Sequence, residues 1–154
     1  PDFECGDRRA WGPKSCGMGH TDAVTSIQVD YARGLVYTVS YDATAIQWDV
    51  HGNMRSQARG FHSDKIINSA LSRDGNWLAT AAFDHVALFQ CDAKSGLMCC
   101  ALVDYSWESG RQEDRRWFAV AFLPDRELCG ELESPEYLPQ GLVMGDNNGD
   151  AWLV

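Results

Sequence analysis

The 154-residue chain has the length of a single domain, and its content of 45% hydrophobic and 11% aromatic residues excludes a disordered polymer. A formal net charge of −9 argues against a nucleic-acid partner, because phosphate contacts need clustered lysine and arginine. The sequence contains neither 18 consecutive apolar residues nor the basic and apolar regions of a signal peptide, so we expect no membrane span and an intracellular address, cytoplasmic or nuclear.

The first elements along the chain are short strands. The N-terminal segment 1–18 contains RRAWGPKSCGM, a candidate outer strand for closing a blade, which Gly12 and Pro13 would restrict to a sheet edge. The next unit, 19–60, contains VTSIQV, LVYTVS and TAIQWD, runs rich in β-branched and aromatic residues that are typical of strands. NMRSQAR is suited to a fourth strand, and no amphipathic helix is expected.

The second unit, 61–103, repeats the first at a shift of 42 residues. His20 falls on His62 and Asp42 falls on Asp84, and the apolar positions between them agree without a gap. Four short strands in a unit of roughly 40 residues are the signature of a propeller blade.

The third unit, 104–154, repeats the pattern less closely. WFAVAFLPD predicts one strand, and GLVMGDNNGDAWLV predicts a strand, a tight turn and a further strand. Two long insertions, 104–116 and 125–140, interrupt the unit, and loops of this length are usually functional or disordered.

Six cysteines are spaced irregularly, with no C-x2-C pair. Cys5, Cys16 and His20 resemble part of a zinc site, but no fourth ligand is obvious nearby. We therefore expect free intracellular thiols, with no bound metal and no cofactor.

Short motifs in the first unit resemble the WD-repeat β-propeller family. Gly-His (19–20) precedes the first strand, Ser-x-Asp (40–42) follows the second, and Trp-Asp (48–49) ends the third. The resemblance implies an all-β fold whose blades are sheets of four antiparallel strands. It also implies a hydrogen-bonded network within a blade, formed by a His, a Ser or Thr, a turn Asp and a Trp. The implied members are His20, Ser40, Asp42 and Trp48, with His62 and Asp84 in the second unit.

Later units depart from this pattern. In the second unit Ala82 aligns with Ser40, and Gln90 aligns with Trp48, with Phe89 one residue earlier, so its network is expected to be incomplete. In the third unit the positions of the His, Ser, Asp and Trp fall on Glu113, Asp146, Asn148 and Val154.

The strand count predicts about three blades, whereas propellers normally have roughly four to eight. We therefore expect a partial propeller. It would be part of a longer chain, half of a ring assembled from two copies, or a set of blades whose open ends another subunit covers.

The resemblance implies a rigid, non-enzymatic scaffold for protein partners, often within a multi-subunit complex. Partners would bind the face that carries the loops before the first strand and after the second strand of each blade. An alternative is a propeller-framed hydrolase or other enzyme domain, but no G-x-S-x-G nucleophile elbow is present. The acidic surface favours a partner with a basic segment. The candidate partner-binding residues are Asp22, Tyr41, Asp64, Lys65, Phe83, Trp107 and Asn147, although Tyr41 and Phe83 could instead pack on the neighbouring blade.

Overall fold

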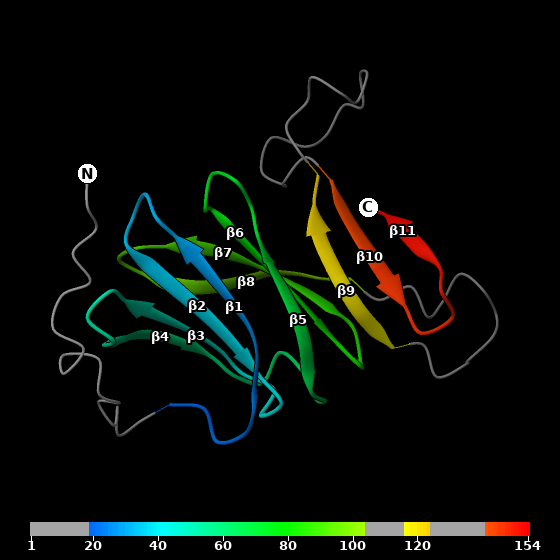
Figure 1. The fold of residues 1–154 in the computed structure, drawn as a ribbon, viewed down its shortest axis with the longest axis horizontal. Helices are drawn as coiled ribbons and strands as arrows, with labels where there is room; N and C mark the ends of the chain where they lie inside the picture. The colour runs from blue at the N-terminus through cyan, green and yellow to red at the C-terminus, as the bar shows by residue number, and fades with distance from the viewer. Residues whose placement is uncertain (1–18, 104–115, 124–140) are drawn as a thin grey trace, which may run out of the picture.

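The computed structural model describes residues 19–103, 116–123 and 141–154, and every regular element in these ranges is a strand. Three antiparallel sheets lie in a row (Figure 1). The first contains β1 (Val24–Asp30), β2 (Leu35–Ser40), β3 (Ala45–Asp49) and β4 (Met54–Ala58). The second contains β5 (Ile66–Leu71), β6 (Trp77–Ala82), β7 (Val86–Asp92) and β8 (Gly96–Val103). The third contains β9 (Trp117–Phe122), β10 (Leu142–Asp146) and β11 (Ala151–Leu153).

Each sheet is a blade in which consecutive strands pair as neighbours. The all-β fold with blades of four antiparallel strands is thus confirmed for the first two sheets, and three strands of the third are described. The described blades form a partial propeller and do not close into a ring (Figure 1). Among the described residues, no helix has the length and apolar character needed to cross a membrane. The boundaries proposed above for the sequence units stay a prediction.

Two apolar layers hold the blades together. Leu35, Tyr37 and Val39 of β2 face the second blade, because alternate residues of a strand point to the same side of a sheet. Ala79 and Ala81 of β6 contribute in the same way to the layer between the second and third blades. The first layer also contains Leu78, Ala87 and Phe89, and the second also contains Val86, Leu88, Trp117, Val120, Leu142 and Met144.

The first strands of the blades lie side by side, with β5 between β1 and β9 (Figure 1). Two side chains of β1 join it to β5: the Thr25 hydroxyl donates to the carbonyl of Ile66 at 2.8 Å, and the Gln28 amide donates to that of Ser69 at 2.8 Å. These bonds fix the relative position of the blades, so the loops at the strand ends are held on a rigid frame.

Gly96 marks a close approach between the first two blades. It has a φ of +85°, and a Cβ atom there would lie 2.4 Å from Cβ and Oγ of Ser56 on β4. Gly96→Ala is expected to lower the free energy of unfolding by more than the ~1–2 kcal/mol that a left-handed conformation alone costs a residue with a Cβ atom. Chemical denaturation of the variant would measure the loss.

Gly60 provides the matched control, because its φ is +77° and nothing lies within 4 Å of an added Cβ. Gly60→Ala therefore carries the backbone strain without the clash. Equal losses in the two variants would show that the contact between Gly96 and Ser56 has no effect on stability.

Candidate functional site: the blade networks and the loop face

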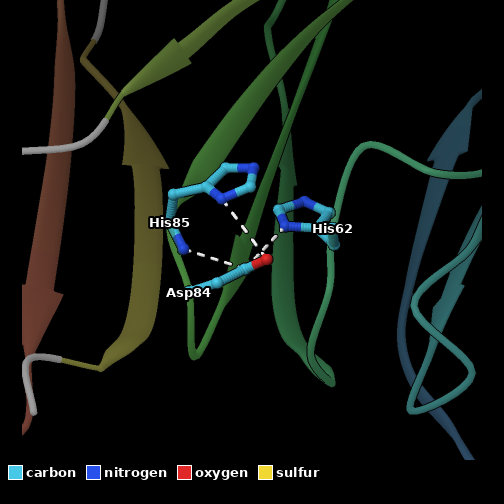
Figure 2. Close-up of side chains that lie close together, drawn as sticks. All are labelled: His62, Asp84 and His85. Carbon is cyan, nitrogen blue, oxygen red and sulfur yellow. Dashed lines mark hydrogen bonds and ion pairs between the residues drawn. The ribbon is translucent and has the colours of Figure 1, made fainter.

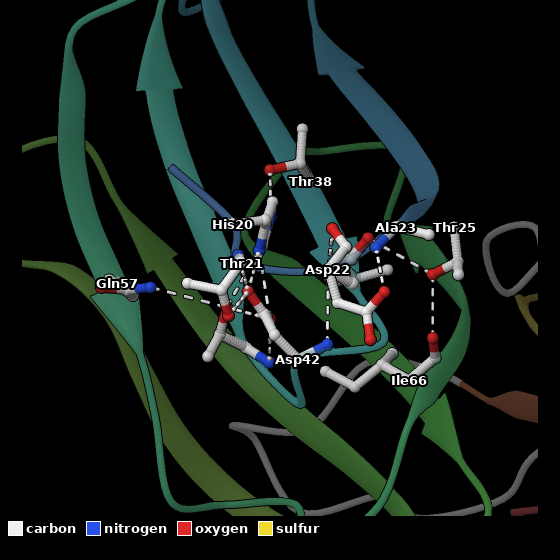
Figure 3. Close-up of polar contacts among 12 residues, drawn as sticks. His20, Thr21, Asp22, Ala23, Thr25, Thr38, Asp42, Gln57 and Ile66 are labelled. Atoms are coloured by element: carbon white, nitrogen blue, oxygen red, sulfur yellow. Dashed lines mark hydrogen bonds and ion pairs between the residues drawn. The ribbon is translucent and has the colours of Figure 1, made fainter. Parts of the chain in front are cut away.

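A chain of hydrogen bonds crosses the first blade. The indole N–H of Trp48 donates to the Thr38 hydroxyl at 2.8 Å, and that hydroxyl lies 2.7 Å from Nε2 of His20. Nδ1 of His20 is 3.2 Å from both carboxylate oxygens of Asp42 (Figure 3). Asp42 can only accept when ionised, so in the neutral imidazole Nδ1 carries the proton and Nε2 accepts from Thr38.

Asp42 ties the turn between β2 and β3 to the residues that precede β1. Its carboxylate accepts the backbone N–H of Thr21 at 2.7 Å, and the N–H and hydroxyl of Thr44 at 3.0 and 2.6 Å. Burial by itself would raise the pKa of Asp42, but these bonds and the nearby His20 lower it below its usual value. The turn also holds Ala43 at a φ of +61°, a conformation that a non-glycine residue rarely adopts.

Ser40 differs from its expected role, because Thr38 supplies the hydroxyl of the network. The Ser40 hydroxyl instead donates to the carbonyl of Asp22 at 3.1 Å and accepts the backbone N–H of Asp42 at 3.1 Å. Both side chains lie on the same side of β2, but the imidazole of His20 reaches only the one nearer the middle of the strand.

The second blade repeats the network more completely than its sequence suggests. Nδ1 of His62 is 3.0 Å from Asp84, and Nε2 is 2.7 Å from the Thr80 hydroxyl. Burial alone would raise the pKa of Asp84, but hydrogen bonds from Ser63 and His62 hold it at about 2. Desolvation by burial lowers the pKa of His62, so this imidazole is neutral at pH 7.

Phe89, and not Gln90, occupies the position of Trp48 in the second blade. Trp48 pairs with Val36 of β2, and Phe89 pairs with Leu78, the residue of β6 that corresponds to Val36. The displacement arises in the turn between the second and third strands of each blade. Five residues lie between the last paired residues of these strands in the first blade, and four lie between them in the second. The phenylalanine side chain has no N–H, so Thr80 lacks the indole donor that Trp48 gives to Thr38.

Comparison with known proteins agrees with this geometry. Residues 13–49 match the family model described as "WD domain, G-beta repeat". The match ends with β3, so it covers most of the first blade and none of the other two. No curated protein sequence matches the chain. Among solved structures, the Dos1 propeller is similar, with a TM-score of 0.67 and 19% sequence identity. The match covers 86% of this chain and 32% of the Dos1 chain. The Cps50 (Swd1) β-propeller domain of Myceliophteria thermophila gives a TM-score of 0.63 and 17% identity, with 88% of this chain and 35% of its own covered. The chain thus spans about a third of each structure, and identities this low show the fold alone.

The three blades present the same backbone contact at one end. The N–H of Tyr41 donates to the carbonyl of Ala23 at 3.0 Å, and the same bond joins Phe83 to Lys65 at 3.4 Å and Asn147 to Arg116 at 3.1 Å. Each bond connects the turn after a blade's second strand to the residue just before its first strand. The residues at this end of the blades are called the loop face: Asp22, Tyr41, Asp64, Lys65, Phe83, Arg116 and Asn147.

Cations of the loop face lie over aromatic rings of the preceding blade. Nζ of Lys65 is 5.1 Å from the ring centroid of Tyr41, and Cζ of Arg116 is 5.0 Å from that of Phe83. Phe83 also contacts Phe118 of the third blade, with centroids 5.4 Å apart, and is half-buried, whereas Tyr41 remains 37% exposed. Phe83 therefore packs mainly on the neighbouring blade, and Tyr41 is the accessible ring.

The other predicted surface residues are placed as follows. Asp22 and Asp64 are exposed, and each caps the next residue by accepting its backbone N–H at 2.7 Å. Trp107 lies outside the described residues, as does Glu113. In the third blade Asp146 caps its own turn, accepting the N–H of Asn148 at 2.9 Å and the indole N–H of Trp152 at 3.2 Å.

The cysteines of the described ranges are free thiols: Cys91, Cys99 and Cys100. Burial raises the pKa of Cys91 to about 12, so this thiol is protonated and behaves as a small apolar core residue. Cys5, Cys16 and Cys129 lie outside the described residues.

Four residues of the site were missed from the sequence: Thr38, Thr80, Arg116 and His85, whose Nδ1 lies 3.3 Å from Oδ2 of Asp84. The two threonines repeat at the 42-residue shift, a signal that could have identified them. His85 and Arg116 carry no such signal, because their roles depend on the shortened turn and on the contact between blades.

Proposed function

We propose that this chain is a non-enzymatic scaffold of the WD-repeat type and that its loop face binds a protein partner. The repeated placement of a cation from one blade over an aromatic ring of the preceding blade supports this proposal. Tyr41 presents an exposed ring beside Lys65, and tyrosine is enriched among the residues that dominate protein interfaces.

The partner is proposed to carry a basic segment. Asp22 and Asp64 occur at matching points of two blades, one on each side of the exposed Tyr41 turn in sequence. Each carboxylate caps one backbone N–H and stays exposed, so its charge is available to a lysine or arginine of the partner.

The arrangement of Ser40, His20 and Asp42 argues against the alternative of a hydrolase with these residues as a catalytic triad. The hydroxyl of Ser40 is bonded to the carbonyl of Asp22, while both ring nitrogens of His20 are engaged by threonine hydroxyls and Asp42. No base is therefore directed at Ser40, and a nucleophilic serine needs one.

A peptide-display screen on the immobilised chain, followed by fluorescence anisotropy of the enriched peptides, tests the proposed function. Tyr41→Ala and Asp64→Asn are expected to weaken binding by about tenfold or more, as substitutions at interface anchors do. Lys94→Ala, in the turn between β7 and β8, is the control and is expected to leave affinity within about twofold. Enriched peptides that lack basic residues, or that respond to Lys94 and not to Tyr41, would contradict the proposal.

The mode of assembly and the intracellular address stay predictions. Ile27 and Val29 of β1 are 60% and 42% exposed, and Leu153 of β11 is 64% exposed, so apolar residues remain uncovered on the first and third blades. Light scattering would distinguish a pair of chains from a single chain or a larger assembly.

A further inference from the structure

The second blade differs from the first at the carboxylate of its network. In the first blade Thr44 precedes β3 and donates to Asp42 at 2.6 Å. The corresponding residue before β7 is His85, whose Nδ1 lies 3.3 Å from Oδ2 of Asp84. The second blade therefore directs two imidazoles at one carboxylate (Figure 2).

His62, Asp84 and His85 have the spacing of a metal-binding set. One ligand atom from each residue lies within 4.8 Å of the other two. Ligands at about 2.0–2.1 Å from a tetrahedral zinc ion are roughly 3.3 Å apart, so a rotation of the rings would be needed to bring the three ligand atoms to that spacing. The rings are stacked, with centroids 4.5 Å apart and planes at 20°, so the two rings must tilt toward each other for both nitrogens to reach one ion.

The surroundings of Asp84 hold it in place without using the imidazoles. Its carboxylate accepts the backbone N–H of Ser63 at 2.6 Å, the Ser63 hydroxyl at 2.9 Å and the backbone N–H of His85 at 2.9 Å. Outer hydrogen bonds of this kind orient a ligating carboxylate. Asp84 and His85 keep 17% and 16% of their side-chain surface exposed, which gives an ion access from solvent.

The Thr80 hydroxyl allows His62 to release Nδ1 for a metal. It lies 2.7 Å from Nε2 of His62 and 3.4 Å from the carbonyl of Ala87. When the imidazole proton moves from Nδ1 to Nε2, the Thr80 oxygen can accept a hydrogen bond from Nε2–H, and the Thr80 hydroxyl can donate to the carbonyl of Ala87. The imidazole stays neutral throughout, as a ligand must.

The first blade lacks both features. Its Thr38 hydroxyl already accepts the indole N–H of Trp48, and Thr44 supplies an alcohol where the second blade has an imidazole. Two residues thus distinguish the second blade from the first: Phe89 at the position of Trp48, and His85 at the position of Thr44.

We propose that His62, Asp84 and His85 form a binding site for a divalent transition-metal ion of the zinc type, coordinated through the two Nδ1 atoms and one carboxylate oxygen, with a fourth position left to water or to a partner's side chain. Two nitrogen ligands and one oxygen ligand suit zinc. This inference departs from the expectation of no metal drawn from the sequence, and it does not depend on the proposed loop-face function.

Histidine ¹⁵N–¹H correlation spectra of the full chain during a titration with zinc chloride test the proposal. One equivalent of zinc is expected to shift the ring nitrogens of His62 and His85 and to move the His62 proton from Nδ1 to Nε2. His20 and His51 are expected to remain unchanged, and they serve as internal controls within the same spectrum.

His85→Thr is the decisive variant, because it gives the second blade the arrangement found in the first. We expect it to fold and to lose more affinity for zinc than the roughly 10–100-fold that outer-shell substitutions cost. His51→Asn, in the exposed turn after β3, is expected to bind zinc as the parent does. Unchanged His62 signals in the parent, or equal affinity in His85→Thr, would overturn the proposal. Equal affinity in His85→Thr is the result expected if the cysteines alone bind the zinc.

Discussion

Replacing Thr38 by valine is expected to lower the free energy of unfolding by about 2–3 kcal/mol, although the two side chains have nearly the same shape. The hydroxyl bonds both the indole N–H of Trp48 and Nε2 of His20, at 2.8 and 2.7 Å. Valine leaves both groups without a partner, and each buried unsatisfied group costs about 1–3 kcal/mol. We place the total below the full sum because Trp48 is only half-buried. Urea denaturation monitored by tryptophan fluorescence would measure the change in the free energy of unfolding.

Ser40→Ala is the matched control for this result. Its hydroxyl bonds the carbonyl of Asp22 and the N–H of Asp42 but neither Trp48 nor His20, so we expect a loss of about 1 kcal/mol. If Ser40→Ala proves as damaging as Thr38→Val, or if Thr38→Val changes stability by less than about 0.5 kcal/mol, Thr38 is not the centre of the network.

Phe89→Ala is expected to lower the free energy of unfolding by about 3–5 kcal/mol, the usual cost of truncating a buried phenylalanine. The ring is 1% exposed and belongs to the apolar layer between the first two blades. It also meets Phe61 edge to face, with centroids 5.5 Å apart. The loss should therefore appear as lower cooperativity between the two blades as well as a lower denaturation midpoint.

Gln90→Ala separates the two possible registers of β7. Gln90 is exposed, so its truncation is expected to change stability by no more than about 0.5 kcal/mol. The gapless comparison of the two units places Gln90 at the position of Trp48. A larger loss for Gln90→Ala than for Phe89→Ala would restore that register and contradict the shortened turn.

Much of the fold could be predicted because strands leave a local signal. Apolar residues alternate along LVYTVS, and β2 covers the same six residues. The repeat then placed the corresponding strands of the second blade, because each blade must bury the same sides of its sheet. The contacts between blades left no such signal. Arg116 and Phe83 are far apart in sequence and meet only when the third blade packs on the second.

The network was harder to predict for a geometric reason. Thr38 and Ser40 are two residues apart and therefore point to the same side of β2, so spacing alone does not decide which one reaches His20. In the second blade the turn is one residue shorter, and a shift of one residue exchanges the two sides of a strand. The apolar Phe89 beside the polar Gln90 was the only local sign of that shift. His85 followed from the same turn and was missed for the same reason.

The tautomers of the blade histidines give the most direct test of the two blade networks. Histidine ¹⁵N–¹H spectra of the metal-free chain at pH 8 distinguish a protonated Nδ1 from a protonated Nε2. The hydrogen bonds require His20 and His62 to carry their protons on Nδ1, facing Asp42 and Asp84, while Nε2 accepts from Thr38 and Thr80. Protons on Nε2 in both residues would contradict the networks, and with them the explanation of how each turn is fixed to its blade.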